Sequence, residues 1–504
     1  MAKIAIVKVR SPHDVEWQVP TVVDTALGLI PGLKAMRDHL RSTAGQPFMP
    51  QLTLPYLAAL GQRYNEAHGT DHRFELVDDR LERIRLRGYD MVWFTAVSPT
   101  APAVYQLSDR ARAAGVTTVI GGIHATMLPD EVEAHADAIV MGEGETTVAE
   151  ILADWDRDRR LRPRYIGGHD VPLEGLPVPR WRDAQLADYC PWLMPVQTSR
   201  GCRNACHFCS TTRYQGARRR HRPVREVVDE IVQLRDQGVL TPDKVIFFTD
   251  NNIVSDTDHR RGVTDTAYAR ELFRALAPLD VLWTGQGEIN VADDLELTEL
   301  MARAGCMNLL IGFESIQQDN LAAVGKPSNT VETYVRQIET LHRHGIAIIG
   351  CFIFGLDHDD HDVFERTARF IERYIEVPQI SLLTPFPGTP LHRRMAREGR
   401  LLHTDWSQYD ITHVVFRPGN MTPEELEIGY RQLYRRLFSW SAILTRSLRF
   451  AVRSTVIDRP DFGRTSRFTS VLAPNLVYSN LCRIGRDLPG NDLSYGRVPE
   501  WQAR

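Results

Sequence analysis

The chain has 504 residues, 43% hydrophobic and 25% charged, an ordinary balance for a soluble protein of two to four domains. Its net charge of −4 gives no general case for nucleic-acid binding. The start, MAKIAIVKVRSPHDVEW, is a poor secretory signal, and we find no run near the roughly 20 apolar residues of a membrane helix. We therefore expect a cytoplasmic protein that binds no nucleic acid.

The first part of the chain alternates between strand and helix patterns. Amphipathic stretches at 52–67 and 101–115 predict helices. Five apolar runs are typical of strands: 3–9, 73–79, 89–98, 116–122 and 136–144. This α/β alternation favours a doubly wound, Rossmann-like, mostly parallel sheet over residues 1–155. Residues 156–193 are charged and then rich in Pro and Gly, so we expect a linker there.

Strand and helix patterns resume at residue 194. The stretch 223–238 predicts a helix, with an apolar stripe that runs from Val224 to Leu234. Six apolar runs predict strands: 194–199, 244–250, 281–286, 307–315, 346–355 and 380–385. Six β/α units predict a partial (β/α)6 barrel over residues 194–400, with its site at the carboxyl ends of the strands. Residues 401–504 are expected to be a mainly helical extension.

A three-cysteine motif follows the first barrel strand. Cys202, Cys206 and Cys209 have C-x3-C-x2-C spacing. A structural zinc site has four ligands, usually in two separated pairs, and His207 lies too close to its neighbours to be a comfortable fourth. A disulfide fits neither the expected compartment nor the count of seven cysteines. An iron–sulfur cluster fits best, because three thiolates leave one iron open.

This motif at the head of six β/α units resembles the radical SAM superfamily over about residues 190–400. The resemblance implies that Cys202, Cys206 and Cys209 hold a 4Fe-4S cluster. Its open iron would bind S-adenosyl-L-methionine (SAM), which one electron cleaves to a 5′-deoxyadenosyl radical. The implied donor is a protein such as flavodoxin or ferredoxin. For the implied SAM contacts, an ordinary loop hydrogen bond is the alternative. They are Asp250, Asn252, Gln286, Glu288, Glu314 and Ser315.

Glycines mark two strand ends of the first domain, GGIHATMLPDE (121–131) and GEGE (142–145). They indicate either a cofactor crevice or tight turns. Ahead of a radical SAM barrel, GGxHxT and GEGE resemble the cobalamin-binding class of that superfamily. No D-x-H-x-x-G motif is found, so for His124 we prefer local hydrogen bonding to cobalt ligation. The implied cobalamin contacts are Thr95, Ser98, Thr100, Gly121, Gly122, His124, Thr126, Gly142, Glu143, Gly144 and Glu145.

Three further stretches carry weaker signals. We interpret the basic run GARRRHRPVR (216–225) as a solvated face rather than a docking surface. The loop LLTPFPGTPL (382–391) either closes the site or only stiffens the barrel. The last hundred residues resemble the extension of hopanoid and bacteriochlorophyll methylases, which implies a cap over the barrel. Arg446, Arg449 and Arg453 beside apolar residues suggest contact with a membrane surface.

The resemblance implies a cobalamin-dependent radical SAM C-methyltransferase that acts on an unactivated carbon of a small molecule. The sequence does not identify the substrate, and lipid-like compounds and natural-product intermediates are among the classes that it allows. The radical would abstract a substrate hydrogen, and cobalamin, methylated by a second SAM, would donate the methyl group. The alternative is a radical SAM cyclisation, rearrangement or oxidation without methyl transfer. An iron–sulfur electron carrier would not need polar groups on six strand ends.

Overall fold

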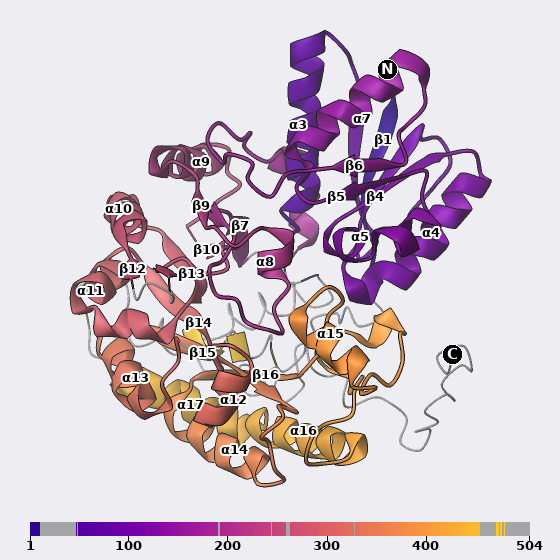
Figure 1. Cartoon of the computed structure of the whole chain (residues 1–504). Coiled ribbons are helices and arrows are strands. Elements are labelled where there is room, and N and C mark those ends of the chain that lie inside the picture. The colour runs from indigo at the N-terminus through magenta and orange to yellow at the C-terminus, as the bar shows by residue number, and fades with distance from the viewer. Residues whose placement is uncertain are drawn as a thin grey trace.

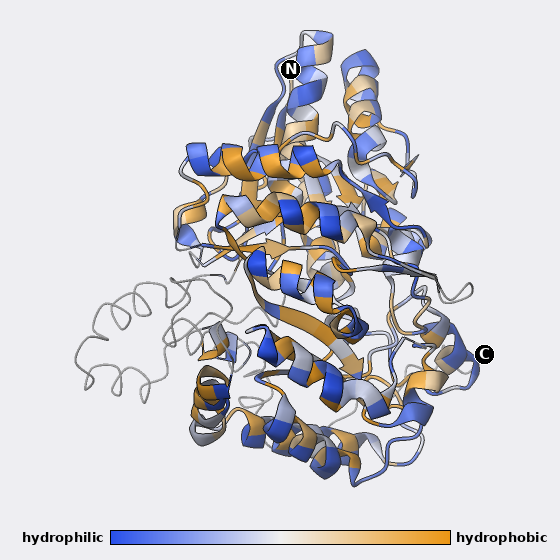
Figure 2. Cartoon of the chain, turned by 90° about the vertical axis from the view of Figure 1, so that its left-hand side faces the viewer, coloured by the Kyte–Doolittle hydropathy of each residue, from blue (hydrophilic) through white to orange (hydrophobic). Residues whose placement is uncertain are grey.

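The computed structural model describes residues 1–10, 47, 49–189, 192–242, 244–258, 263–326, 328–453, 470–472, 474–475 and 478. The chain forms two parallel sheets, each accompanied by helices (Figure 1). The indigo and purple part of Figure 1 holds the first sheet, and the second, curved sheet is surrounded by helices. Hydrophobic residues concentrate in the strands and on the inner helix faces, as Figure 2 shows.

The first sheet has six parallel strands in the order β2-β1-β3-β4-β5-β6. They are β1 (Lys3–Lys8), β2 (Arg73–Asp78), β3 (Met91–Thr95), β4 (Thr117–Gly121), β5 (Ala138–Met141) and β6 (Arg164–Ile166). The order reverses between β1 and β3, the kind of switch point at which open α/β sheets bind ligands. The prediction of a doubly wound sheet is confirmed.

Both faces of this sheet are buried, as the doubly wound topology requires. Ile4 and Ile6 belong to the core beneath α3 (Thr53–His68) and α7 (Gly144–Asp158). Ala5 and Val7, the alternating residues of β1, belong to the core beneath α4 (Ala101–Ala113). This period of two, with apolar side chains on both faces, explains why the strands appear in the sequence as continuous apolar runs.

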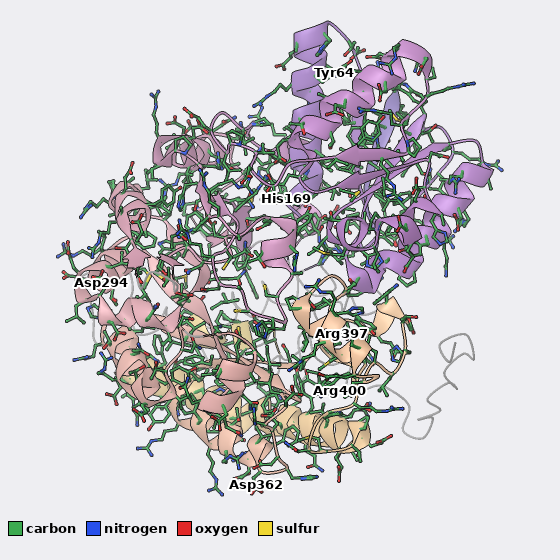
Figure 3. All side chains as sticks on the ribbon, viewed as in Figure 1. Tyr64, His169, Asp294, Asp362, Arg397 and Arg400 are labelled. Carbon is green, nitrogen blue, oxygen red and sulfur yellow. The ribbon has the colours of Figure 1, made fainter. Side chains whose placement is uncertain are left out.

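The segment expected as a linker contains the last strand of the first sheet. Helix α7 continues to Asp158, and Arg164–Ile166 forms β6, which pairs with β5. The charged composition of this stretch hid a strand of three residues. Beyond β6 the chain crosses toward the second sheet, where His169 Nδ1 lies 2.9 Å from the carbonyl oxygen of Tyr214 (Figure 3).

The second sheet is also parallel, and its strands follow sequence order, β7-β10-β13-β14-β15-β16. They are β7 (Leu193–Val196), β10 (Val245–Phe248), β13 (Leu282–Gly287), β14 (Cys306–Glu314), β15 (Ala347–Phe354) and β16 (Val377–Leu382). The connecting helices include α9 (Val224–Asp236), α10 (Ala267–Leu276), α11 (Leu295–Arg303), α13 (Tyr334–Arg343) and α14 (Val363–Tyr374). Sequential order in an all-parallel sheet is the topology expected for the partial barrel.

The C-terminal region adds α15 (Pro390–Arg397), α16 (Pro423–Leu437) and α17 (Trp440–Arg453). The Arg446 side chain is buried, and its Nε donates to the Glu376 carbonyl oxygen at 3.0 Å. Arg449 likewise donates to the carbonyl oxygens of Glu372 and Ile375. Two of the three arginines on which a membrane-surface contact was suggested therefore bind protein carbonyls. In the described part of the chain, no helix has the length and apolar character needed to cross a membrane.

Candidate active site

The loop that contains the three cysteines connects two short strands that pair with each other. Strands β8 (Ser199–Arg200) and β9 (Arg220–His221) pair antiparallel at its base. Gly201 begins the loop with φ +89°, and a Cβ there would lie 2.2 Å from the Arg218 carbonyl oxygen. Only glycine fits this position, because an L side chain would meet both strain and backbone. The turn thus leads from β8 directly into Cys202.

The three thiols occupy a partly buried environment. Cys206 is buried, whereas Cys202 and Cys209 are half-buried. Burial raises the pKa of the Cys202 thiol to about 11 and that of Cys206 to about 12. No three His, Cys, Asp or Glu side chains among the described residues surround one ion position. Each of the three thiolates would bind a different iron of a 4Fe-4S cluster, and the iron charge would stabilise the thiolate form, so this donor set fits a cluster.

His207 fastens the loop to its surroundings. Its backbone N–H donates to the Val324 carbonyl oxygen at 2.9 Å, and its Nδ1 lies 3.1 Å from the Ala323 carbonyl oxygen. The Leu391 N–H donates to the His207 carbonyl oxygen at 2.9 Å. The loop 382–391 therefore contacts the cysteine loop directly. On its other side, a Cβ at Gly388 would lie 2.4 Å from Met127 Sδ in the first domain.

Three of the residues expected to bind SAM lie around the cysteine loop. Glu288 is buried and accepts a hydrogen bond from Asn204 Nδ2 within the loop. Asn252 lines a small hollow together with Cys202. Glu314 pairs with Lys326, and its backbone has the positive φ of +61°. A non-glycine residue in this conformation is strained, which is frequent at functional sites.

The other three expected SAM residues have local roles. Asp250 is fully buried and accepts from Thr198 Oγ1 at 2.6 Å, from the Thr198 N–H at 3.0 Å and from Ser199 Oγ. It therefore holds the connection between β7 and β8, and a SAM contact of Asp250 stays a prediction. Ser315 Oγ accepts from the Gln317 N–H at 3.1 Å, as in a turn. The backbone of Gln286 is held in place, because its main-chain carbonyl oxygen accepts a hydrogen bond from the Ile253 N–H.

Two cations that the sequence analysis did not single out lie beside the thiols. Burial alone would lower the pKa of Lys326, but Glu314 raises it above its usual value, so the ammonium stays charged close to Cys206. Arg219 is buried in the hollow beside Cys202, and its Nη2 has no partner among the described residues. Burial lowers the pKa of Arg219. The sequence did draw attention to the basic run 216–225, which includes Arg219.

Only part of that basic run is a solvated face: Arg218 and Arg225 are exposed. Arg219, Arg220 and Arg222 are buried. Arg220 Nη1 donates to Glu143 Oε2 at 2.8 Å, and Arg222 Nη1 donates to Glu230 Oε2 at 2.5 Å. For these three residues the interpretation from composition was wrong because periodicity cannot show that each guanidinium meets a buried carboxylate or carbonyl.

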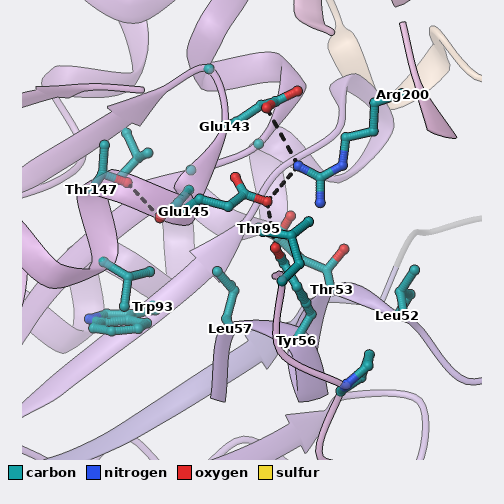
Figure 4. A pocket seen from close by; sticks show the side chains of 18 of the residues that line it. Leu52, Thr53, Tyr56, Leu57, Trp93, Thr95, Glu143, Glu145, Thr147 and Arg200 are labelled. Carbon is teal, nitrogen blue, oxygen red and sulfur yellow. Dashed lines mark hydrogen bonds and ion pairs between the residues drawn. The ribbon is translucent and has the colours of Figure 1, made fainter. Parts of the chain in front are cut away.

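A cleft whose empty space, counted together with the open solvent at its mouth, is about 1250 Å³ lies where the first sheet faces the cysteine loop (Figure 4). Its floor is apolar and includes Trp93, Val119 and Val140. Arg200, Tyr214 and Gln215 of the hairpin and loop also line it, as does Tyr56 of α3. Seven of the expected cobalamin contacts line this cleft: Thr95, Gly121, Gly122, Gly142, Glu143, Gly144 and Glu145.

The other four expected contacts do not line the cleft. His124 is buried, with Nδ1 3.2 Å from Ser98 Oγ and Nε2 2.9 Å from the Tyr105 hydroxyl. Thr100 Oγ1 donates to the Val97 carbonyl oxygen. Thr126 Oγ1 donates to the Gly122 carbonyl oxygen and accepts from the Gly142 N–H at 2.9 Å. Thr126 thus links the glycine after β4 to the glycine after β5 without lining the cleft itself.

The cleft has the features of a site for a large polar ligand. A Cβ at Gly122 would lie 2.7 Å from the Ala96 carbonyl oxygen, so glycine leaves the strand end open to a ligand. Trp93 Nε1 and Glu145 Oε2 are buried and have no partner among the described residues. One is a donor and the other an acceptor, and buried polar groups normally have partners. Cobalamin, whose corrin side chains are amides that offer both, fits this cleft.

Three parts of the chain match known protein families. Residues 196–371 match the radical SAM superfamily, residues 46–152 match the B12 binding domain, and residues 389–470 match a domain of unknown function, DUF4070. The chain is 34% identical over 408 residues to bacteriochlorophyllide d C-12(1)-methyltransferase of Chlorobaculum tepidum, covering 80% of this chain and 85% of the relative. It is 30% identical over 422 residues to cytidylyl-2-hydroxyethylphosphonate methyltransferase of Streptomyces wedmorensis, covering 70% and 76%.

The fold is shared with a solved structure, the radical SAM methyltransferase TsrM of Kitasatospora setae with cobalamin and a 4Fe-4S cluster bound. The TM-score is 0.61 at 17% identity, covering 96% of this chain and 99% of TsrM. Fold and sequence together define a radical SAM enzyme with a cobalamin-binding domain. The chain belongs to the cobalamin-dependent radical SAM methyltransferases, whose cofactors are a 4Fe-4S cluster, SAM and cobalamin.

Proposed function

We propose that this enzyme transfers a methyl group to an unactivated carbon of a small organic molecule, using the two sites described above. The supporting observation is that one hairpin serves both sites. Arg200 ends β8 and lines the cleft, while Gly201 and Cys202 follow it directly in the cysteine loop. Two cofactors held on the two sides of this hairpin would face a common space, as radical formation and methyl transfer on one substrate require.

The residues have separate tasks in this proposal. Cys202, Cys206 and Cys209 would ligate the cluster, and Asn252, Glu288 and Glu314 are the candidate SAM contacts. Thr95 and the glycine-bearing ends of β4 and β5 would hold cobalamin. When bound, the cluster with SAM supplies the 5′-deoxyadenosyl radical, and cobalamin supplies the methyl group. The chain would orient these groups toward one another.

Anaerobic reconstitution of the full chain with iron, sulfide and hydroxocobalamin tests this proposal. We expect about four irons per chain after desalting, together with about one cobalamin. Addition of SAM and dithionite, or of flavodoxin as the proposed physiological type of donor, should yield 5′-deoxyadenosine. Cobalamin absent from the desalted protein, with SAM cleavage intact, would contradict methyl transfer and favour a rearrangement or oxidation.

The cluster assignment has a matched control. Cys206→Ala should lose most of the bound iron and all SAM cleavage, yet retain cobalamin at saturating concentration. Cys351→Ala removes a thiol of β15 outside the loop, whose Sγ contacts Gln379 Oε1, and should keep its iron. Full iron content in Cys206→Ala would show that the assignment is wrong.

The relatives suggest where a substrate search begins. Those at 34% and 30% identity methylate a bacteriochlorophyllide and a cytidylyl phosphonate, respectively. We propose a chlorin-type tetrapyrrole as the first class to test and a nucleotide-linked phosphonate as the second. Incubation with SAM that carries a deuterated methyl group should give a product heavier by one labelled methyl group, detected by mass spectrometry.

A further inference from the structure

A buried group of two arginines and two glutamates joins the two sheets. Glu143 caps α7 and Glu145 lies in its first turn, and Arg200 and Arg220 come from paired positions of the β8–β9 hairpin. Arg200 Nη1 lies 2.5 Å from Glu145 Oε1 and 3.5 Å from Glu143 Oε2. Figure 4 shows both glutamates directed toward Arg200. The four charges balance, so the group is neutral as a whole.

Stability alone does not explain this arrangement. Buried ion pairs lose much of their Coulomb energy to desolvation, and apolar side chains of similar size are often as stable. What such a pair does supply is fixed geometry, because the planar guanidinium meets a carboxylate in a defined orientation. Burial alone would lower the pKa of Arg200. The neighbouring Glu145 and Glu143 outweigh this effect, so the pKa lies above its usual value and the guanidinium remains charged.

Glu145 is divided between two neighbours. Its Oε1 accepts from Arg200 and, at 2.7 Å, from the Tyr56 hydroxyl. Its Oε2 is buried in the wall of the cleft and has no partner among the described residues. A buried carboxylate oxygen without a donor is costly, so a ligand N–H that reaches it would be favoured. An amide side chain of the corrin has the required donor.

Arg200 is also tied to the cysteine loop. Its backbone pairs with Arg220, and the next residue, Gly201, turns the chain into Cys202. Cys202 N–H donates to the Gly216 carbonyl oxygen at 3.3 Å, and Gly201 packs against Arg218. A shift of the Arg200 side chain would therefore move the hairpin on which the first cluster ligand is mounted.

We propose that Arg200 is a positioning residue that couples occupancy of the cobalamin cleft to the geometry of the cluster loop through Glu145. The inference rests on the proposed function, because it takes both cofactors to bind where that proposal places them. Coupling between two sites is reciprocal, so each cofactor should raise the affinity for the other by the same factor.

The test is the affinity for hydroxocobalamin, measured by anaerobic equilibrium dialysis on the full chain with and without its reconstituted cluster. In the wild-type protein we expect the cluster to tighten cobalamin binding about tenfold. Arg200→Lys keeps the positive charge but loses the planar guanidinium with its several N–H donors. Glu145→Gln keeps the shape of the side chain but loses its negative charge. In both variants the ratio of the two affinities should fall to about one, and the cobalamin-dependent change in the electron paramagnetic resonance spectrum of the reduced cluster should disappear.

The control is Arg80→Lys, which alters a comparable pair within the first domain, Arg80 Nη2 to Asp78 Oδ2 at 2.6 Å, away from the cleft. It should keep the wild-type ratio. A wild-type ratio of one, an unchanged ratio in Arg200→Lys or Glu145→Gln, or an equal loss in Arg80→Lys would overturn the inference while the proposed function stands. A wild-type protein that binds no cobalamin would overturn both.

Discussion

At the residue scale, chemical type and position at a strand end do not by themselves identify a ligand contact. Asp250 and Glu145 are both acidic residues beyond the ends of parallel strands. Both oxygens of Asp250 accept hydrogen bonds from Thr198 and Ser199, whereas Glu145 Oε2 has no partner among the described residues. Asp250 therefore already serves the local fold, whereas Glu145 Oε2 still lacks a donor.

Gly122 provides a stability and binding prediction at this scale. Gly122→Ala introduces a side chain at φ +101° with its Cβ 2.7 Å from the Ala96 carbonyl oxygen. Gly115→Ala, at φ +78° with nothing within 4 Å, also has a positive φ but no clash. We expect a loss of unfolding free energy of about 1 kcal/mol for Gly115→Ala and about 3 kcal/mol for Gly122→Ala.

Urea unfolding measures these two losses, and equilibrium dialysis measures cobalamin binding. Gly122→Ala should weaken cobalamin binding by about tenfold or more, equivalent to about 1.4 kcal/mol. Gly115→Ala lies away from the cleft and should not weaken it. Equal losses in both variants would show that the close approach at Gly122 has no energetic role.

At the element scale, the β8–β9 hairpin decides where the cysteine loop lies, and it contains a titratable residue. The His221 ring stacks on Tyr268 with centroids 4.0 Å apart, and its Nδ1 has no partner among the described residues. Burial and the neighbouring Arg219 hold the pKa of His221 at about 4. The folded hairpin therefore contains a neutral imidazole.

This lowered pKa predicts acid sensitivity of the hairpin. In the unfolded chain the histidine pKa is about 6.5, so between pH 6.5 and 4 the unfolded state binds more protons. Stability should then fall as pH decreases through this window, by at most about 3 kcal/mol from this residue. His221→Phe keeps the stacked ring without the titration, so its melting temperature should depend less on pH there.

Thermal unfolding between pH 4 and 7 checks this prediction. His169→Gln alters an exposed histidine whose Nδ1 contacts the Tyr214 carbonyl oxygen, and should keep the wild-type pH dependence. Parallel curves for the wild-type protein and His221→Phe would show that other groups cause the acid sensitivity.

At the scale of the whole molecule, the C-terminal region docks onto the first domain as well as onto the barrel. Trp406, in the short helix η7 (Trp406–Gln408), donates from Nε1 to Glu131 Oε1 at 2.8 Å. Its ring lies edge-on to His124, with centroids 5.7 Å apart. The histidine of the GGxHxT motif is therefore part of an interface between domains, on the side of the sheet away from α3 and α7.

Trp406→Phe should loosen this interface. It removes a hydrogen bond to a carboxylate, worth about 1.5–3 kcal/mol, and keeps most of the apolar contact. We expect faster amide hydrogen exchange in α6 (Pro129–Glu133) and around residues 403–409, with α9 unchanged. Trp440→Phe, in α17, is the control and should leave both segments as in the wild type. Unchanged exchange in Trp406→Phe would contradict the docking role.

Much of the fold was predictable because most helices and strands follow from the local pattern of apolar and polar residues. Apolar runs such as 3–9 and 346–355 became strands, and the Val224–Leu234 stripe became the buried face of α9. The strand β6 was missed because its three residues, one of them arginine, carry little apolar signal. The basic run 216–225 was misjudged in part because composition does not show that Arg220 meets Glu143, far away in the sequence, or that Arg222 meets Glu230 of the following helix.

The sequence by itself determined the chemistry that this protein can perform, because thiol spacing and glycine-bearing strand ends are local properties of the chain. Cys202, Cys206 and Cys209 lie within one loop, and Gly121, Gly122 and Gly142 lie at ends of adjacent strands. Only the tertiary structure decided which polar groups remain available to a ligand. Hydrogen-bond partners are chosen in three dimensions, so His124 and Asp250 are satisfied locally, while Arg200 and Glu145 meet at the seam between the two sheets.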